Sequence, residues 1–307
     1  MPSQTSDRKY LLLKELRKIE VFDGLRYNHN GFLSKKESVT NMDIRERLCV
    51  ATVGKEAVQL SKEYGIGIEL DHFCWTENMD EPKAANVNKR IRNELSECKA
   101  KRRILHAPFQ ELFPCAIDSK IRAVALDRFE ETMKLAHLYS ASRVVVHTGF
   151  MPNLYYREWH YKKSVEFWTN FMQGKPDGYM LCIENVLEED PDQMIELIDG
   201  INAREAELGG RHRYGICLDV GHAAYRSSVP VTEWIRRLGS RIVHTHLHNN
   251  DGTGDKHDVF DCEGAAFSMA EALAALEECA AEDVTHTIEA LEPRPCLQWL
   301  GTHGYLG

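Results

Sequence analysis

Histidine and aspartate are concentrated in one stretch of the chain, residues 244–258, which reads HTHLHNNDGTGDKHD. The stretch contains four histidines and three aspartates in fifteen positions. Imidazole and carboxylate together suit zinc, manganese or cobalt better than magnesium or calcium, which prefer oxygen ligands alone. The same two groups transfer protons in general acid–base catalysis. The stretch therefore predicts one wall of a divalent metal site.

Metal-competent side chains also end several strand-like runs elsewhere in the chain. Taken in chain order, these ends carry His106, His147, Glu184, Asp219 with His222, His246 and Glu289. Histidines without a common role would fall on helices and loops as readily as on strand ends. Six consecutive strands that all end in such a side chain predict a bound divalent ion where the strand ends meet.

The strand-like runs alternate with longer amphipathic runs. We expect strands within 48–52, 65–73, 102–109, 143–150, 180–186, 214–222, 241–248 and 284–291. We expect helices within 55–65, 87–101, 119–140, 161–174, 190–209, 231–239 and 267–283. Eight strands alternating with helices over roughly 250 residues predict an α/β fold, the (β/α)8 TIM barrel. A doubly wound open sheet is the alternative, although no G-x-G-x-x-G motif follows an early strand.

The domain organisation follows from the position of the first expected strand. Residues 1–45 precede it and are interpreted as an N-terminal extension, and residues 46–307 as the TIM barrel catalytic domain. Within the extension, Tyr10–Ile19 could form a helix that packs on the barrel or serves oligomerisation. The chemistry of such a barrel lies at the carboxyl ends of its strands.

Side chains along a barrel strand alternate between the lumen and the surrounding helices. If Glu184 faces the lumen, Leu181 and Ile183 face the helices, and Glu289 in the lumen likewise sends Ile288 outward. The seventh strand differs because three alternate histidines would face the lumen. Since two residues of strand advance by about 6.6 Å, only one or two of them can reach a single ion.

We therefore assign different roles to the three histidines of the seventh strand. We expect His246 to bind the ion, His244 to lie deeper as a hydrogen-bonded lumen residue, and His248 to sit at the rim. The loop that follows adds Asp255 and His257 in a D-x-H pattern.

Composition limits the compartment and the partners. The chain has 307 residues and a net charge of -9, which repels polyanions and argues against a nucleic-acid partner. Its nine cysteines are scattered singly without a C-x-x-C pair, as expected in a reducing compartment. No stretch is long and apolar enough for a membrane span or a signal peptide. We expect a cytoplasmic protein without a membrane partner.

Seven short motifs carry a resemblance to a known family. They are HAPF (106–109), VVHTG (145–149), CIEN (182–185), CLDVGH (217–222), HLHNNDG (246–252), DKH (255–257) and IEAL (288–291). Their order resembles that of the xylose isomerase-like barrel superfamily, which unites sugar (phosphate) isomerases and epimerases with endonuclease IV. The resemblance covers residues from about 48 to 291.

The resemblance implies two alternative sites. The epimerase-type site is one divalent ion, zinc or manganese first and cobalt or magnesium next, held by Glu184, Asp219, His246 and Glu289. The endonuclease-type site holds further zinc ions through His106, His147, His222, Asp255 and His257. Because all nine positions match, the ligand inventory permits both.

The chain departs from the family pattern at several positions, and the acidic stretch 183–194 among them favours the small-molecule branch. The chain has His147-Thr148-Gly149 where relatives often have His-Pro-Gly, and Asn249-Asn250 where many have Asp-Asn. Cys262-Glu263-Gly264 replaces the usual Gly-x-Gly, which puts the substrate contact of that turn in question. The stretch IENVLEEDPDQM (183–194) is acidic where the endonuclease branch has a Gly/Thr-rich loop. An acidic rim weakens binding to a DNA backbone.

We therefore expect a metal-dependent isomerase or epimerase that transfers a proton next to a carbonyl of a sugar, sugar phosphate or related polyol. Glu184 and Glu289 would be the catalytic pair, and His222 and His257 would bind substrate hydroxyls. Glu69 is interpreted either as a substrate contact or as an ion pair at the barrel floor. A hydride shift or a dehydration would use much the same residues.

The alternative is an endonuclease IV-like multi-zinc phosphodiesterase acting on abasic DNA. The expected partner is a small-molecule carbohydrate rather than a nucleic acid, and a homo-oligomer is left open.

Overall fold

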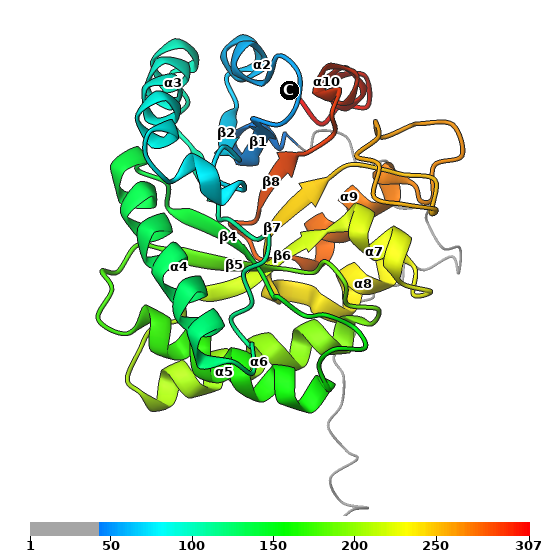
Figure 1. Cartoon of the computed structure of the whole chain (residues 1–307). Coiled ribbons are helices and arrows are strands. Elements are labelled where there is room, and N and C mark those ends of the chain that lie inside the picture. The colour runs from blue at the N-terminus through cyan, green and yellow to red at the C-terminus, as the bar shows by residue number, and fades with distance from the viewer. Residues whose placement is uncertain (1–42) are drawn as a thin grey trace, which may run out of the picture. The chain divides into compact units, whose positions relative to one another are not determined.

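The computed structural model describes residues 43–307, in which eight parallel strands close into a barrel in chain order, surrounded by helices (Figure 1). The strands are β1 (Leu48–Ala51), β2 (Gly67–Leu70), β3 (Arg103–His106), β4 (Arg143–His147), β5 (Met180–Glu184), β6 (Tyr214–Asp219), β7 (Ile242–Leu247) and β8 (Thr285–Ile288). Each lies within a range expected from the sequence. The prediction of a (β/α)8 TIM barrel is confirmed.

The helices pack outside the barrel and follow most of the expected ranges. They are α2 (Ala57–Tyr64), α3 (Lys83–Cys98), α4 (Ser119–Tyr139), α5 (Arg157–Met172), α6 (Pro191–Glu207), α7 (Val220–Arg226), α8 (Val231–Leu238), α9 (Met269–Cys279) and α10 (Pro293–Thr302). Within residues 43–307, no helix has the length and apolar character needed to span a bilayer.

Two helices, α7 and α10, were not expected from the sequence. The expected sixth strand ran to His222, but Asp219 ends β6 and also caps α7, because its carboxylate accepts the His222 backbone N–H at 2.6 Å. Helix α10 begins at Pro293, which is tolerated at the first helical position because its missing N–H would have no intrahelical acceptor there. Because proline is unfavourable inside a helix, the two prolines of this segment obscured its helical character in the sequence.

The N-terminal extension lies almost entirely outside the described residues, including the expected helix Tyr10–Ile19. At its end, Ile44 is buried in the core and its N–H donates to the Tyr305 carbonyl at 3.0 Å. The boundary between extension and barrel at residue 45 stays a prediction.

The core has an outer layer and a lumen layer. Val144, Val146, Leu181 and Ile183 belong to the outer cluster that packs against the helices, as the alternation predicted. A separate cluster fills the lower lumen and consists of Cys49, Ile104, Val145, Cys182, Cys217 and Val243. Burial raises the pKa of the Cys182 thiol to about 12, so this cysteine serves as a small apolar side chain. All nine cysteines of the chain are free.

One irregularity interrupts the pairing of β6 with β7. Ile216 pairs with Ile242 and Cys217 pairs with His244, so Val243 is an extra residue on β7. Val243 projects into the lumen cluster, where Gly215 leaves room for it. A Cβ at position 215 would lie 2.3 Å from Val243 Cγ2. The absence of a side chain at 215 therefore permits the bulge, and His244 and His246 follow it directly.

We predict that Gly215→Ala lowers the free energy of unfolding by about 1–3 kcal/mol, because the added methyl overpacks the lumen. Urea unfolding measures this change. In the Val243→Ala background the cost should be smaller, since the clashing side chain is gone. Gly301→Ala is the matched control, because no atom lies within 4 Å of a Cβ at that helical position. Equal stability of Gly215→Ala and Gly301→Ala would contradict this reading of the bulge.

Candidate metal and active site

The carboxyl ends of the strands bring all nine sequence-predicted ligand positions to one end of the barrel. His106, His147, Glu184 and Asp219 are the last residues of β3, β4, β5 and β6, while His246 lies on β7 and Glu289 directly after β8. A cavity of about 500 Å³ opens above them. Its lining includes His106, His147, Glu184, His222, Asp255, His257 and Glu289. Asp219 and His246 are fully buried and do not line the cavity.

Three carboxylates converge on one nitrogen of His246. The Nδ1 atom lies 3.2 Å from Glu289 Oε2, 3.4 Å from Glu184 Oε1 and 3.6 Å from Asp219 Oδ2. This nitrogen is buried and makes no hydrogen bond. Ligand atoms of a tetrahedral zinc site lie about 3.3 Å from one another, as follows from metal–ligand distances near 2.0–2.1 Å. The spacing and the unpartnered nitrogen both fit a site for one divalent ion.

Glu184 contacts four imidazoles through its two carboxylate oxygens. Its Oε2 lies 3.2 Å from Nε2 of both His106 and His147. Its Oε1 lies 3.3 Å from His222 Nδ1 and 3.4 Å from His246 Nδ1. Burial alone would raise the pKa of Glu184, but the neighbouring imidazoles hold that pKa well below its usual range. An ionised carboxylate in this position can bridge two groups of ligands.

A further group lies at the cavity mouth. Asp255 Oδ2 is 3.2 Å from His222 Nε2 and 3.3 Å from His257 Nε2. The Nδ1 atom of His222 is 2.9 Å from the Asn185 carbonyl, so Nδ1 carries the proton in the neutral ring and Nε2 is free toward Asp255. Together with the residues around His246 and Glu184, this group belongs to a series of overlapping His, Asp and Glu clusters that could hold a metal.

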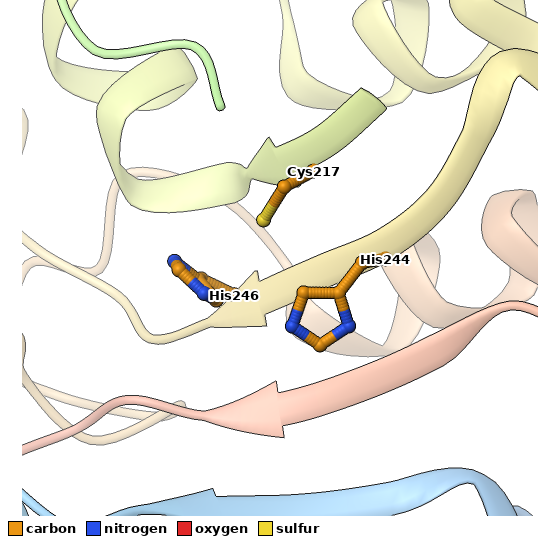
Figure 2. A group of neighbouring side chains, drawn as sticks. All are labelled: Cys217, His244 and His246. Atoms are coloured by element: carbon orange, nitrogen blue, oxygen red, sulfur yellow. The ribbon is translucent and has the colours of Figure 1, made fainter. Parts of the chain in front are cut away.

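His244 and Cys217 lie deeper in the lumen beside His246 (Figure 2). His244 Nδ1 is 2.7 Å from Thr285 Oγ1, and its Nε2 is 3.1 Å from Glu69 Oε2. This is the deep, hydrogen-bonded position expected from the sequence. Burial raises the pKa of the Cys217 thiol well above its usual value. We interpret His244 and Cys217 as the floor of the site beneath His246.

Glu69 is fully buried and does not line the cavity. It accepts hydrogen bonds from His244, His246 and Thr287. Its buried location and hydrogen bonds fit the ion-pair interpretation of Glu69, and a substrate contact stays a prediction.

His248 differs from its expected position at the rim, because its side chain is completely buried. Its Nε2 lies 3.1 and 3.0 Å from the two carboxylate oxygens of Asp219, and its ring stacks on His257 with centroids 4.1 Å apart. Gly221 makes this possible, since a Cβ there would lie 2.0 Å from His248 Cε1. His248 therefore orients the Asp219 carboxylate, which His246 also contacts.

The sequence reasoning missed a pair of site residues after β2. Asp71 and His72 line the cavity, and Asp71 Oδ2 accepts the Val53 N–H at 3.0 Å and the Thr52 hydroxyl at 3.1 Å. Burial and the charge of Glu69 raise the pKa of Asp71 to about 7. A polar side chain at the end of a strand was the feature that identified the other site residues. Asp71 and His72 show the same feature at the end of β2.

Apolar and polar groups complete the cavity wall. Phe109 stacks on the His147 ring with centroids 4.2 Å apart, and Trp75 is 57% exposed at the opening. Arg90 is the one Lys or Arg side chain lining the cavity within residues 43–307, and it bonds Glu94 at 2.7 Å. The cavity thus offers ring faces and many hydrogen-bonding groups but little positive charge.

We predict that Gly221→Ala lowers zinc affinity by about 10-fold or more, because the displaced His248 no longer orients Asp219. Competition with a chromophoric chelator measures the affinity. Gly254→Ala is the control, since this neighbouring loop position has open space for a Cβ. Unchanged affinity in Gly221→Ala would show that His248 does not act on the metal site.

We also predict that metal binding releases protons. In the metal-free protein, burial opposes the charged form of His257, but Asp255 and Glu289 raise its pKa to about 9. Burial likewise opposes the charge on His222, while Asp219 and Asp255 raise its pKa well above the usual value. Because a divalent ion bound beside these two imidazoles disfavours their protonated forms, metal affinity should rise with pH between about pH 6 and 9.

Calorimetry in buffers of different ionisation enthalpy counts the protons released at pH 7. His257→Gln should release fewer of them than the unaltered protein. An apparent binding enthalpy that is the same in every buffer would rule out this coupling.

Three comparisons relate the chain to known proteins. The family model described as "Xylose isomerase-like TIM barrel" matches residues 58–296. An uncharacterized protein of Methanocaldococcus jannaschii is 26% identical over 168 residues, which are 50% of this chain and 53% of that protein. The chain thus spans about half the length of this curated relative.

Solved structures share the fold at lower identity. A Thermus thermophilus protein soaked with zinc chloride has a TM-score of 0.63 at 22% identity, over 84% of this chain and 97% of its own. A D-tagatose 3-epimerase-like protein also has a TM-score of 0.63, at 21% identity, over 84% and 96%. A family 2 AP endonuclease from Brucella melitensis has 0.59 at 15% identity, over 84% and 98%. Because the family model covers most of the barrel, the chain belongs to the xylose isomerase-like TIM barrel family.

Proposed function

We propose that the protein is a divalent-metal-dependent isomerase or epimerase that transfers a proton next to the carbonyl of a sugar, sugar phosphate or related polyol. The observation that carries this proposal is the convergence of Glu184, Asp219 and Glu289 on His246 Nδ1 beneath a cavity of about 500 Å³. A cavity of this size suits a monosaccharide. The fold shared with a D-tagatose 3-epimerase-like protein supports the substrate class.

The residues present fit a divalent ion. The unpartnered, buried Nδ1 of His246 and the mixed nitrogen and oxygen donors suit zinc or manganese. Glu184, Asp219, His246 and Glu289 would hold the ion. When bound, it supplies Lewis-acid polarisation of a substrate carbonyl and its neighbouring hydroxyl, which stabilises an enediolate.

Glu184 and Glu289 differ in their surroundings, and this difference suggests separate roles in proton transfer. The Glu289 side chain is 12% exposed, whereas that of Glu184 is 2% exposed and lies among four imidazoles. Glu289 is therefore the freer base for removing a proton from the substrate carbon. Glu184 faces it from β5 and can return the proton at the opposite face.

Other residues would orient the substrate. His222 and His257 stand at the cavity mouth and can bind hydroxyl groups through their ring nitrogens. Trp75 and Phe109 offer aromatic faces to the apolar face of a sugar ring. Asp71, with its pKa near 7, lies in the same cavity and can exchange a proton with a substrate hydroxyl.

A second candidate is metal-assisted phosphodiester hydrolysis. The observation that favours it is the contact of Glu184 with four imidazoles, joined by Asp255 and His257, which could hold several ions. Against it, binding to a nucleic-acid backbone depends on Lys and Arg contacts to phosphates. The described cavity lining contains a single guanidinium, already paired with Glu94, and the chain carries a net charge of -9. The small-molecule reaction is therefore preferred.

We predict that manganese- or zinc-loaded protein incorporates solvent deuterium into a free or phosphorylated ketose, followed by proton NMR in heavy water. Glu289→Gln should slow this exchange by about 100-fold or more, since it removes the proton acceptor. Glu292→Gln is the matched control, because Glu292 is a nearby exposed carboxylate paired with Lys55.

Two results would contradict the proposal. Isomerisation without deuterium incorporation would replace proton transfer by a hydride shift. Nicking of an abasic duplex, with about three zinc ions per chain and no exchange on any sugar, would establish the hydrolase instead.

A further inference from the structure

We propose that Glu69 is a positioning residue that holds His246 with its Nδ1 atom aimed at the metal-binding carboxylates. The inference rests on the metal site of the proposed function, but not on which reaction that site performs. Glu69 comes from β2 and His246 from β7, so the contact crosses the barrel lumen.

Both carboxylate oxygens of Glu69 accept hydrogen bonds from side chains at the base of the metal site. Its Oε1 accepts the His246 Nε2–H at 3.1 Å. Its Oε2 accepts from His244 Nε2 at 3.1 Å and from the Thr287 hydroxyl at 2.5 Å. All four side chains are fully buried. A carboxylate without water around it is stable only when several donors surround it, and here three do.

The bond to Glu69 decides which nitrogen of His246 is available. An imidazole that donates one N–H to a carboxylate presents its other nitrogen as a lone pair. Since Nε2 donates to Glu69, Nδ1 is the free nitrogen, and it is the atom that lies within 3.2–3.6 Å of three carboxylates. The carboxylate behind the ring also increases the basicity of the ligand.

Neighbouring rings prevent His246 from turning away from this orientation. The His244 ring meets it edge-on, at 90° with centroids 5.3 Å apart, and the His106 ring stacks on it at 5.6 Å. His244 is itself fixed by Glu69 and Thr285. Glu69 thus fixes His246 directly and, through His244, indirectly.

A substrate-binding role would require Glu69 to reach the cavity, but it does not line that cavity. A merely structural ion pair would contribute to stability without affecting the metal. The two roles are separated by measuring metal affinity and stability on the same variant.

The central experiment compares Glu69→Gln with Thr245→Val. Glutamine keeps the size of the side chain but faces three donors with one acceptor oxygen. We expect zinc affinity to fall by about 10- to 100-fold, as for other residues that support a metal-binding histidine. Thr245→Val removes a buried hydrogen bond to His286, which joins β7 to β8 outside the lumen. It should lower the unfolding temperature without changing zinc affinity.

A spectroscopic measurement on the unaltered protein makes the test independent of how the variant folds. Zinc-loaded protein with nitrogen-15 histidine should show His246 protonated at Nε2 and metal-bound at Nδ1. Cobalt(II)-loaded Glu69→Gln should show a shifted ligand-field spectrum, and cobalt(II)-loaded Thr245→Val should not.

Each outcome has a distinct meaning. Equal zinc affinity of Glu69→Gln and the unaltered protein, or a His246 that binds zinc through Nε2, would overturn the role of Glu69 and leave the proposed function standing. Unaltered protein that binds neither zinc nor manganese would overturn both.

Discussion

The structure depends on neutralising four carboxylates held in the upper lumen of the barrel. Glu69 and Asp219 are fully buried, Glu184 is nearly so, and the Glu289 side chain is 12% exposed. A buried carboxylate is costly unless it is paired and hydrogen-bonded. The chain supplies this pairing with histidines from β3, β4 and β7 and from the segments that follow β6 and β7. Any large displacement of a strand would leave one of these charges without a partner.

The same constraint accounts for several features that otherwise have little in common. Gly221 carries no side chain, so His248 can reach Asp219. Gly215 carries none either, so Val243 can bulge inward just before the two lumen histidines of β7. Cysteines and small aliphatic residues fill the lumen below. The lower lumen is therefore apolar, while the upper lumen and the cavity mouth concentrate the ionisable groups.

Much of this arrangement could be predicted from the sequence. Alternating strands and helices were sufficient for the barrel, and side-chain alternation correctly separated lumen residues such as Glu184 from Leu181 and Ile183. The convergence of the site residues at one end of the barrel followed from the fold, because the carboxyl ends of all eight strands meet there. The sequence did not show the double role of Asp219, because one residue ends a strand and caps a helix at the same time. It therefore missed α7.

Other features depended on contacts between elements far apart in the chain. The hydrogen bonds of Glu69 to His244 and His246 join β2 to β7, and the sequence alone did not show this pairing. The burial of His248 depended on the missing Cβ of Gly221. Asp71 and His72 were within reach of sequence reasoning, since both follow β2 as the other site residues follow their strands.

The convergence of Glu184, Asp219, His246 and Glu289 on one point is tested most directly by anomalous diffraction from crystals soaked with zinc. We predict a strong zinc peak about 2.0–2.2 Å from His246 Nδ1 and from oxygens of the three carboxylates. Density for zinc only at surface sites, with the four side chains turned away from one another, would contradict it.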